Sequence, residues 1–354
     1  MGWETLAVSG SDAFVCGVIG YPPLLDVVLG RAAHAEPAVM DGPGWLVPGL
    51  SAQDCARLAF YAGDARDGVV QAAQGPVAVQ VYGDRTDLRS ERALAEALAT
   101  ARDIMALYGV KSAAEVRARS GPMAVRGAAR VRAAVSGAVT RRHAAGPGDV
   151  TVLARREPYA RFFAVEEYDL HHRRFDGAIS PEITRAAFIS GDAVTVLPYD
   201  PLRDRVLVVE QFRAGPFARG DAQPWQIEAI AGRIDPGETP QDAARREAVE
   251  EAGLTLGALL EVAQYYPSPG ICAEYLYSYV AITDLADDAA GVFGLEGEAE
   301  DIRGHLLGFD QLMALVASGE VANAPLILTA YWLASRRDKL VAGLLPRQNS
   351  SKEF

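Results

Sequence analysis

The chain has 354 residues, of which 50% are hydrophobic and 23% are charged, and its formal net charge is −12. This length predicts roughly two domains, and the composition excludes a largely disordered chain. The acidic balance argues against nucleic acid and anionic membranes as partners, because both need a surface rich in Lys and Arg.

The N-terminus and the cysteines indicate a cytoplasmic protein. The opening MGWETLAVSGSDAF has neither the basic nor the apolar stretch of a signal peptide. The longest apolar run is interrupted by Pro22, Pro23 and Asp26, so it is too short to span a bilayer. Three cysteines, far apart in the sequence, argue against a disulfide framework or a zinc ribbon.

The first part of the chain has the pattern of a small α+β domain. Residues 13–84 alternate short apolar runs with turn signals, including a predicted helix over 51–63 and a predicted strand over 75–83. Residues 86–117 are rich in Ala, Leu, Glu and Arg at helical spacing and predict one or two further helices. The first domain, with this helical extension, is therefore expected over residues 1–135.

A linker and a second domain follow. Residues 136–149 combine small residues, Gly, Pro and adjacent charges, as linkers do. The second domain is expected over residues 150–345, and a flexible tail over 346–354. Its predicted strands are VTVLARR, FFAVEEYDLHHRRF, DAVTVLPYD, DRVLVVEQFR and WQIEAIAG, with turns at Asp176-Gly177 and Asp200-Pro201.

A well-specified helix starts after Thr239. Thr239 is the predicted N-cap, Pro240 takes the first helical position, and Asp242 completes a start similar to a capping box. Gly253 provides the C-terminal stop.

Three glutamates, Glu247, Glu250 and Glu251, share one face of this helix because they are spaced three and four residues apart. Like charges at these spacings destabilise a helix by about 0.2–0.5 kcal/mol per pair. Either a divalent cation bound by carboxylate oxygens compensates for this repulsion, or the glutamates form a solvated surface. Arg246 neutralises only part of the cluster.

The glutamates belong to a longer pattern that begins at Gly232. The chain reads GRIDPGETPQDAARREAVEEAGL, with Gly, Glu, Arg-Glu, Glu-Glu and Gly at fixed spacings. This resembles the signature of the Nudix hydrolases without departure. The resemblance implies an α/β chain whose C-terminal domain is a Nudix α/β/α sandwich. It also implies a loop–helix–loop whose glutamates bind Mg²⁺, or alternatively Mn²⁺, against a diphosphate.

From about Val150 to Asp338 the chain is similar to the ADP-ribose pyrophosphatase branch of this family. Pro269, fifteen residues after Leu254, is the position that distinguishes the branch. The resemblance implies hydrolysis of ADP-ribose to AMP and ribose 5-phosphate. The alternatives are another nucleotide sugar, a dinucleotide, or a module that senses ADP-ribose without cleaving it. The last alternative conflicts with the three glutamates, because such modules typically lose them. The resemblance is carried by RRFDGAISPEITRAAFISGDAVTVLPYDP, VVEQFRAG, YYPSPGICAE and GLEGEAEDIRGH.

The resemblance also implies a set of metal ligands. Glu247 and Glu251 are the direct carboxylate ligands, and the backbone carbonyl of Ala231 and the side chain of Glu300 are further ligands. Glu250 is a ligand or a water-mediated ligand.

The implied catalytic set is Glu298, Glu250 and Arg246. Diphosphate hydrolysis needs an in-line water, a carboxylate that orients or deprotonates it, and metal ions that spread the developing charge. Glu298 is the implied base, although it and Glu300 could exchange roles. Arg246 pairs inside the motif, and Glu238 ties the loop to the helix.

Five residues are expected to bind the substrate. Arg213 and Arg185 match positions that contact the phosphates or the terminal ribose, as an Arg can bind phosphate oxygens bidentately. Phe162 matches an aromatic residue that stacks on adenine, the alternative being a strand residue in a dimer interface. Glu228 is expected to bind ribose or adenine, and Pro269 marks the substrate loop. Because the family usually forms homodimers, Phe162 and Arg185 are expected to serve the partner subunit.

Residues 12–84 resemble γ-glutamylcyclotransferase-like domains, which begin with an apolar strand, a Tyr-Gly turn and a Leu-rich helix. Two positions depart from that family: Cys16 replaces the Tyr, and Ala62, before Gly63, replaces the catalytic Glu. Without that carboxylate there is no general base for cyclisation, so we expect an inactive domain. The alternative, an active centre in this domain, predicts release of 5-oxoproline.

Overall fold

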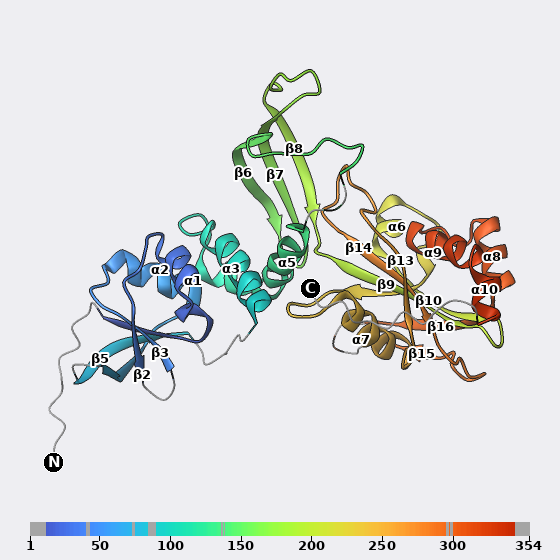
Figure 1. Cartoon of the computed structure of the whole chain (residues 1–354), viewed down its shortest axis with the longest axis horizontal. Helices are drawn as coiled ribbons and strands as arrows, with labels where there is room; N and C mark the ends of the chain where they lie inside the picture. Colours follow the sequence, from blue (N-terminus) through green and yellow to red (C-terminus); the bar gives the residue numbers. More distant parts are fainter. Residues whose placement is uncertain are drawn as a thin grey trace, which may run out of the picture. The chain divides into compact units, whose positions relative to one another are not determined.

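The chain folds as two compact units (Figure 1). The first unit comprises Met1–Val150 and Tyr159–Phe163, and the second comprises Thr151–Pro158 and Ala164–Phe354. Within the described ranges, no helix has the length and apolar composition needed to cross a membrane. The computed structural model describes residues 12–39, 43–72, 75–83, 90–135, 137, 139–294, 297 and 300–343.

Five strands of the first unit close into a barrel. Their order is β1-β3-β2-β4-β5, with β1 antiparallel to β3 and parallel to β5. Closure leaves no free sheet edge. Phe14, Leu46 and Val79 belong to one buried cluster of these strands. The strands are β1 (Ala13–Cys16), β2 (Glu36–Val39), β3 (Pro43–Val47), β4 (Arg66–Ala72) and β5 (Gly75–Tyr82).

Helices cover this barrel. The predicted helix over 51–63 is confirmed as α2, which begins with a capping box between Ser51 and Asp54. α3 and α5 pack closely, since a Cβ at Gly127 of α5 would overlap Thr100 of α3. The predicted helical stretch over 86–117 contains α3 and α4, whereas α5 lies beyond it. The helices are η1 (Gly17–Gly20), α1 (Pro22–Leu29), α2 (Ala52–Ala62), α3 (Glu91–Met105), α4 (Ala113–Arg117) and α5 (Ser120–Ala133).

The second unit is built on an eight-stranded mixed sheet. The order is β13-β14-β9-β10-β16-β15, while β11 pairs with β10 and β12 pairs with β9. The segment predicted as one strand, WQIEAIAG, is therefore two strands that change partner at Ala229. The strands are β9 (Ala193–Asp200), β10 (Arg205–Phe212), β11 (Trp225–Glu228), β12 (Ile230–Arg233), β13 (Leu259–Tyr265), β14 (Leu276–Ile282), β15 (Val292–Phe293) and β16 (Ile302–Gly308).

Helices lie on both faces of this sheet, as the expected α/β/α sandwich requires (Figure 1). On one face, the alanines of α7 (Pro240–Ala252) pack against Val194, Val196 and Val209. On the other, α8 (Phe309–Ser318) and α9 (Ala324–Ala334) pack against Leu197 and Tyr199. Two short helices, α6 (Ala214–Arg219) and α10 (Arg337–Val341), complete the unit.

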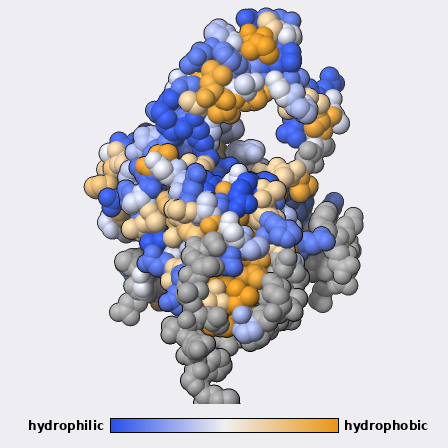
Figure 2. Space-filling model, turned by 90° about the vertical axis from the view of Figure 1, so that its left-hand side faces the viewer, coloured by the Kyte–Doolittle hydropathy of each residue, from blue (hydrophilic) through white to orange (hydrophobic). Residues whose placement is uncertain are grey.

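A separate three-stranded sheet consists of β6 (Val150–Ala160), β7 (Ala164–His172) and β8 (Ile183–Ile189) in that order. Arg155 and the fully buried Glu166 form an ion pair at 2.6 Å between β6 and β7. Figure 2 shows hydrophobic groups among hydrophilic ones over this sheet, at the top of the view. The exposed hydrophobic side chains of this sheet are those of residues such as Val152, Leu153 and Phe188.

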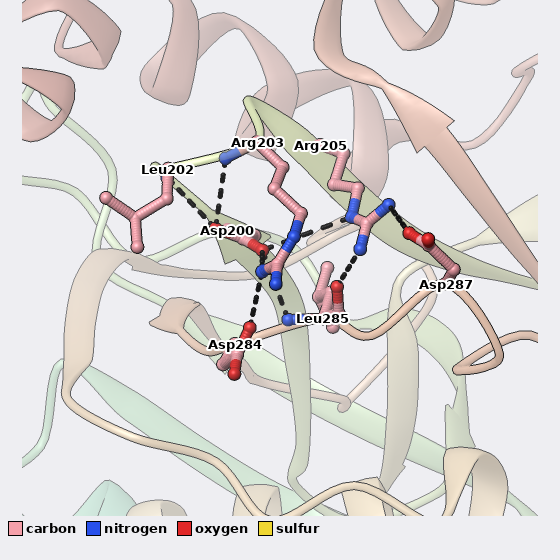
Figure 3. A network of polar contacts seen from close by, with 7 residues as sticks. All are labelled: Asp200, Leu202, Arg203, Arg205, Asp284, Leu285 and Asp287. Atoms are coloured by element: carbon pink, nitrogen blue, oxygen red, sulfur yellow. Dashed lines mark hydrogen bonds and ion pairs between the residues drawn. The ribbon is translucent and has the colours of Figure 1, made fainter.

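A polar network holds the predicted hairpin between β9 and β10 (Figure 3). The buried carboxylate of Asp200 accepts hydrogen bonds from Arg203 Nη1 at 2.6 Å and from Leu285 N at 3.3 Å. Arg203 also donates to Asp284 at 2.5 Å, and Arg205 donates to the Leu285 carbonyl. Burial alone would raise the pKa of Asp200, but these donors hold it below its ordinary value. The network therefore joins the β9–β10 hairpin to the segment that follows β14.

Candidate active site

The glutamate-rich segment forms a loop followed by α7, with the predicted ends. The Thr239 hydroxyl accepts a hydrogen bond from Asp242 N at 3.1 Å, and Pro240 lies in the first turn. Gly253 ends the helix in the left-handed conformation, with φ 62°. Local sequence signals thus determine where the helix begins and where it ends.

Arg246 connects the loop to the helix. Its guanidinium donates two hydrogen bonds to Glu238, at 2.8 and 3.0 Å, and one to the Arg233 carbonyl at 2.8 Å. It also donates to Glu247 at 2.6 Å and to Glu250 at 2.9 Å. These partners, with Glu238 foremost, raise the pKa of Arg246 far above its ordinary value. Arg246 therefore stays charged and orders three carboxylates at once.

Glu247 lies directly against Gly232 of β12. A Cβ built at Gly232 would overlap the Glu247 carboxylate, although the Gly232 backbone is not left-handed. The Glu247 side chain is only 12% exposed. The glycine at this position is therefore explained by space for a carboxylate rather than by backbone conformation.

Glu251 is the most buried acidic side chain of α7, with 3% of its surface exposed. One carboxylate oxygen accepts a hydrogen bond from Ala231 N at 3.0 Å, and the other is 3.5 Å from the Gln211 amide nitrogen. Ala231 therefore lies beside Glu251 through its N–H, while metal binding by its carbonyl stays a prediction. Gln211 is a neighbour that the sequence analysis did not identify.

The carboxylates influence one another electrostatically. Burial raises the pKa of Glu251 to about 8, against the effect of Ala231 N and with a contribution from Glu247. Burial likewise raises the pKa of Glu247 to about 7, opposed by Arg246. Glu300 contributes to both shifts, so it lies in the same electrostatic environment. An acidic cluster of this kind is poised to gain free energy from a cation.

The donor set fits a hard divalent cation with partial protein ligation. In the part of the chain that the structure describes, no group of three or more His, Cys, Asp and Glu side chains is arranged to hold a metal by itself. Mg²⁺ commonly uses only one or two carboxylates, with waters and substrate phosphates completing its shell. The buried, mutually repelling Glu247 and Glu251 suit that mode of binding.

Binding of Mg²⁺ is expected to release protons. At pH 6.5 the raised pKa values leave Glu251 and much of Glu247 protonated, and ligation requires the charged form. We expect release of roughly one to two protons at pH 6.5 and almost none at pH 9.5. Titration calorimetry in buffers of different ionisation enthalpy measures this number, and buffer-independent heats at pH 6.5 would contradict the assignment.

The same pKa shifts make the metal-free fold less stable as the pH rises. Both pKa values in the folded chain exceed the ordinary 4.5, so the folded state binds more protons than the unfolded state between about pH 4.5 and 8. Stability of the metal-free chain therefore falls across that window. We expect saturating Mg²⁺ to raise the melting temperature more at pH 8 than at pH 5.5.

Comparison with known proteins places this site in a family. Residues 190–328 match the NUDIX domain. The chain is 39% identical over 188 residues to the ADP-ribose pyrophosphatase of Escherichia coli strain K12, covering 53% of this chain and 89% of that protein. The chain belongs to the Nudix family.

Other relatives match the same Nudix part. The ADP-ribose pyrophosphatase of Haemophilus influenzae is 34% identical over 187 residues, covering 52% of this chain and 86% of that one. The GDP-mannose pyrophosphatase of Escherichia coli O9:H4 is 30% identical over 166 residues, covering 47% and 84%. A solved structure described as an ADP compounds hydrolase has a TM-score of 0.40 and 20% identity, covering 55% of this chain and 98% of that chain.

Arg213 lies close enough to Glu251 of α7 to influence its carboxylate electrostatically. It follows β10 directly, and its Nε donates to Glu228 of β11 at 2.6 Å. Its charge also opposes the rise that burial causes in the pKa of Glu251 and of Glu274. The structure thus brings Arg213 and Glu228 together next to α7. Glu298, the expected base, lies outside the described residues.

Arg185 and Phe162 belong to the segment that forms the three-stranded sheet. Arg185 is exposed on β8 and donates to the carbonyl of Thr184 at 2.8 Å. Phe162 is exposed in the turn after β6, with its ring centroid 4.8 Å from that of Phe163. Their roles in substrate binding remain predictions.

The loop that contains Pro269 is docked on β8. Phe188 N donates to the Ile271 carbonyl at 2.8 Å, and Ala273 N donates to the Phe188 carbonyl at 2.9 Å. Glu274 comes just after this pairing. Burial raises its pKa, while Arg233 and Arg213 lower it and Ser190 donates to it. The sequence analysis missed Glu274, although it ends the quoted stretch YYPSPGICAE.

Proposed function

We propose that this protein is a metal-dependent pyrophosphohydrolase that cleaves ADP-ribose to AMP and ribose 5-phosphate. The observation that carries the proposal is a pair of carboxylates on α7: the buried Glu251 beside Ala231, and the largely covered Glu247 beside a fixed Arg246. Relatives that match the same segment are ADP-ribose pyrophosphatases at 34–39% identity.

The proposed chemistry assigns one task to each group. Bound Mg²⁺, or Mn²⁺ as the alternative, would neutralise charge that develops on the diphosphate. Glu247 and Glu251, with the Ala231 carbonyl, would hold the cation, and waters and substrate phosphates would fill its remaining positions. Glu300 and Glu250 are proposed as further ligands, Glu250 either directly or through water. Arg246 keeps these carboxylates in place through the contacts described above.

Attack on the diphosphate requires an activated water. We assign its orientation and deprotonation to Glu298, with Glu300 as the alternative. Arg213 would bind the phosphates, and Pro269 would place its loop beside the substrate. These assignments rest on the matched motif and on the position of Arg213 next to Glu251.

We further propose a homodimer in which Arg185 and Phe162 serve the partner subunit. Both side chains are exposed, and the three-stranded sheet carries further exposed apolar side chains, including Val152 and Leu153. Sedimentation velocity is expected to give a dimer of the 37.7 kDa chain. A monomer with full activity would contradict this assignment.

A substrate panel tests the specificity. The relative named GDP-mannose pyrophosphatase makes GDP-mannose the second candidate. We expect kcat/KM for ADP-ribose to exceed that for GDP-mannose and NADH by at least about tenfold. A preference for GDP-mannose would transfer the proposal to that substrate, and tight binding of ADP-ribose without turnover would indicate a sensor.

We propose that the first unit is a γ-glutamylcyclotransferase-like domain without that activity. The buried strand β1, the turn η1 and the Leu-rich α1 follow the order of elements in that family. Ala62, the last residue of α2, occupies the position at which that family has its catalytic Glu, so the general base is missing. We also assign the protein to the cytoplasm, in keeping with its three free thiols.

Limited trypsin digestion tests the boundaries at 136–149. Arg141 and Arg142 are exposed in this stretch. We expect first cleavage there, and we expect the C-terminal fragment to keep about the same kcat. The variant with both arginines changed to Gln is the control and should resist this cleavage. Earlier cleavage inside residues 150–345, or an unfolded fragment, would contradict the boundaries.

A further inference from the structure

The contact between Arg213 and Glu228 suggests a role for Glu228 other than touching the substrate. The backbone of Arg213 is fixed on both sides: its N donates to the Pro224 carbonyl at 3.0 Å, and its carbonyl accepts from Phe217 N at 3.4 Å. The side chain of Arg213 is 39% exposed, whereas that of Glu228 is 17% exposed. Glu228 therefore lies beneath the arginine, and Arg213 lies nearer to solvent.

Glu228 holds one edge of the guanidinium. Its Oε2 accepts the hydrogen bond of Arg213 Nε at 2.6 Å. Within the described ranges, Arg213 Nη1 and Nη2 make no hydrogen bond to the protein. As far as the described residues extend, the two terminal amino groups, which form the fork that binds phosphate oxygens, thus remain available.

The available fork lies in the electrostatic environment of the Nudix site. The Arg213 charge lowers the pKa of both Glu251 and Glu274, which come from α7 and from the end of the Pro269 loop. An anion held against the α7 carboxylates by a cation would therefore be near this guanidinium. A free Arg loses much rotamer freedom when it binds, and an Arg already held by a carboxylate loses less.

We propose that Glu228 is a positioning residue that holds Arg213 by its Nε edge and thereby presents both terminal amino groups to the diphosphate of the substrate. This rests on the proposed function for the identity of the substrate, but the diphosphate alone is sufficient to test it. This role differs from the expectation that Glu228 contacts ribose or adenine. A residue that positions Arg213 affects the binding of any diphosphate, whether or not a ribose or a base is attached.

Removal of Glu228 should change anion binding in opposite directions under the two explanations, long-range charge and positioning of Arg213. Removing a carboxylate near an anion site should strengthen anion binding if only long-range charge matters. If Glu228 positions Arg213, its removal should weaken binding. Glu228→Gln keeps a carbonyl that can accept the Nε hydrogen bond, so this conservative variant should rescue most of the loss.

The test uses methylenediphosphonate, a diphosphate analogue with no ribose, no base and no hydrolysable bridge. Its Kd is measured by calorimetry on the full chain with saturating Mg²⁺. We expect Glu228→Ala to raise the Kd about tenfold and Glu228→Gln less than about threefold. An unchanged or lower Kd in Glu228→Ala would overturn the proposal.

A double-mutant cycle shows whether Glu228 acts through Arg213 or independently of it. Arg213→Lys keeps the charge without the fork, and in that background Glu228→Ala should change the Kd by less than about twofold. Additive losses would overturn the proposal, since they would mean that Glu228 acts independently of Arg213. The matched control is Glu210→Ala. Glu210 lies on β10, and its carboxylate is 2.8 Å from His305 Nε2. We expect no change in Kd for this variant.

Failure of the proposed function remains distinguishable. If the wild-type chain binds methylenediphosphonate with the expected pattern of variants but does not cleave ADP-ribose, the substrate assignment is wrong and the positioning role stands. If the chain cleaves ADP-ribose but Glu228→Ala leaves both Kd and KM unchanged, the positioning role is wrong. Melting temperatures of all variants verify that each one is folded.

Discussion

Replacing Glu251 by Gln is expected to lower kcat for ADP-ribose hydrolysis by about 10²- to 10³-fold, the range seen when one group that stabilises transition-state charge is removed. Gln has the same shape, and its carbonyl can still accept the hydrogen bond from Ala231 N. Since a neutral amide is less costly to bury than a carboxylate, the metal-free variant should melt at the same or a higher temperature.

The matched control is Glu261→Gln. Glu261 is exposed on β13, where it accepts a hydrogen bond from Gln264 at 3.2 Å. Its kcat should stay within about twofold of the wild-type value. Full activity in Glu251→Gln, with the control also active, would show that the buried carboxylate of α7 is not part of the catalytic centre.

Gly232→Ala is the second large effect that we expect. The added methyl group would overlap the Glu247 carboxylate, which is held by Arg246 at 2.6 Å. The carboxylate is the movable partner, so it should shift while β12 keeps its pairing with β9. We expect kcat to fall by about 10²-fold, with a loss of stability of about 1–3 kcal/mol from overpacking.

A second substitution distinguishes displacement of Glu247 from general damage. Glu247→Asp shortens the side chain, so adding it to Gly232→Ala should cost little further activity, whereas the same change in the wild type should cost much. Gly121→Ala is the control, because a Cβ at Gly121 meets no atom within 4 Å. Independent, additive losses would contradict the spatial explanation for Gly232.

Local signals made α7 predictable. Thr239, Pro240 and Gly253 are adjacent in sequence to the helix that they begin and end, so capping chemistry alone located it. The resemblance implied that Glu238 ties the loop to the helix and that Arg246 pairs inside the motif, and the structure pairs these two residues with each other.

Contacts that depend on sheet topology were not predictable. The change of partner at Ala229 arises because β11 and β12 add to different neighbouring strands, which no period in WQIEAIAG indicates. Arg213 and Glu228 meet only because β10 and β11 pair as antiparallel neighbours. Glu274 becomes partly buried only when its loop docks on β8, so the sequence around it gave no signal.

The central claim is tested most directly by measuring AMP release from ADP-ribose by the full chain at saturating Mg²⁺, then with excess EDTA, then after Mg²⁺ is restored. We expect equal amounts of AMP and ribose 5-phosphate, loss of activity with EDTA, and recovery with Mg²⁺. A folded chain that releases no AMP, or one that releases AMP equally well with EDTA, would contradict a metal-dependent ADP-ribose pyrophosphohydrolase.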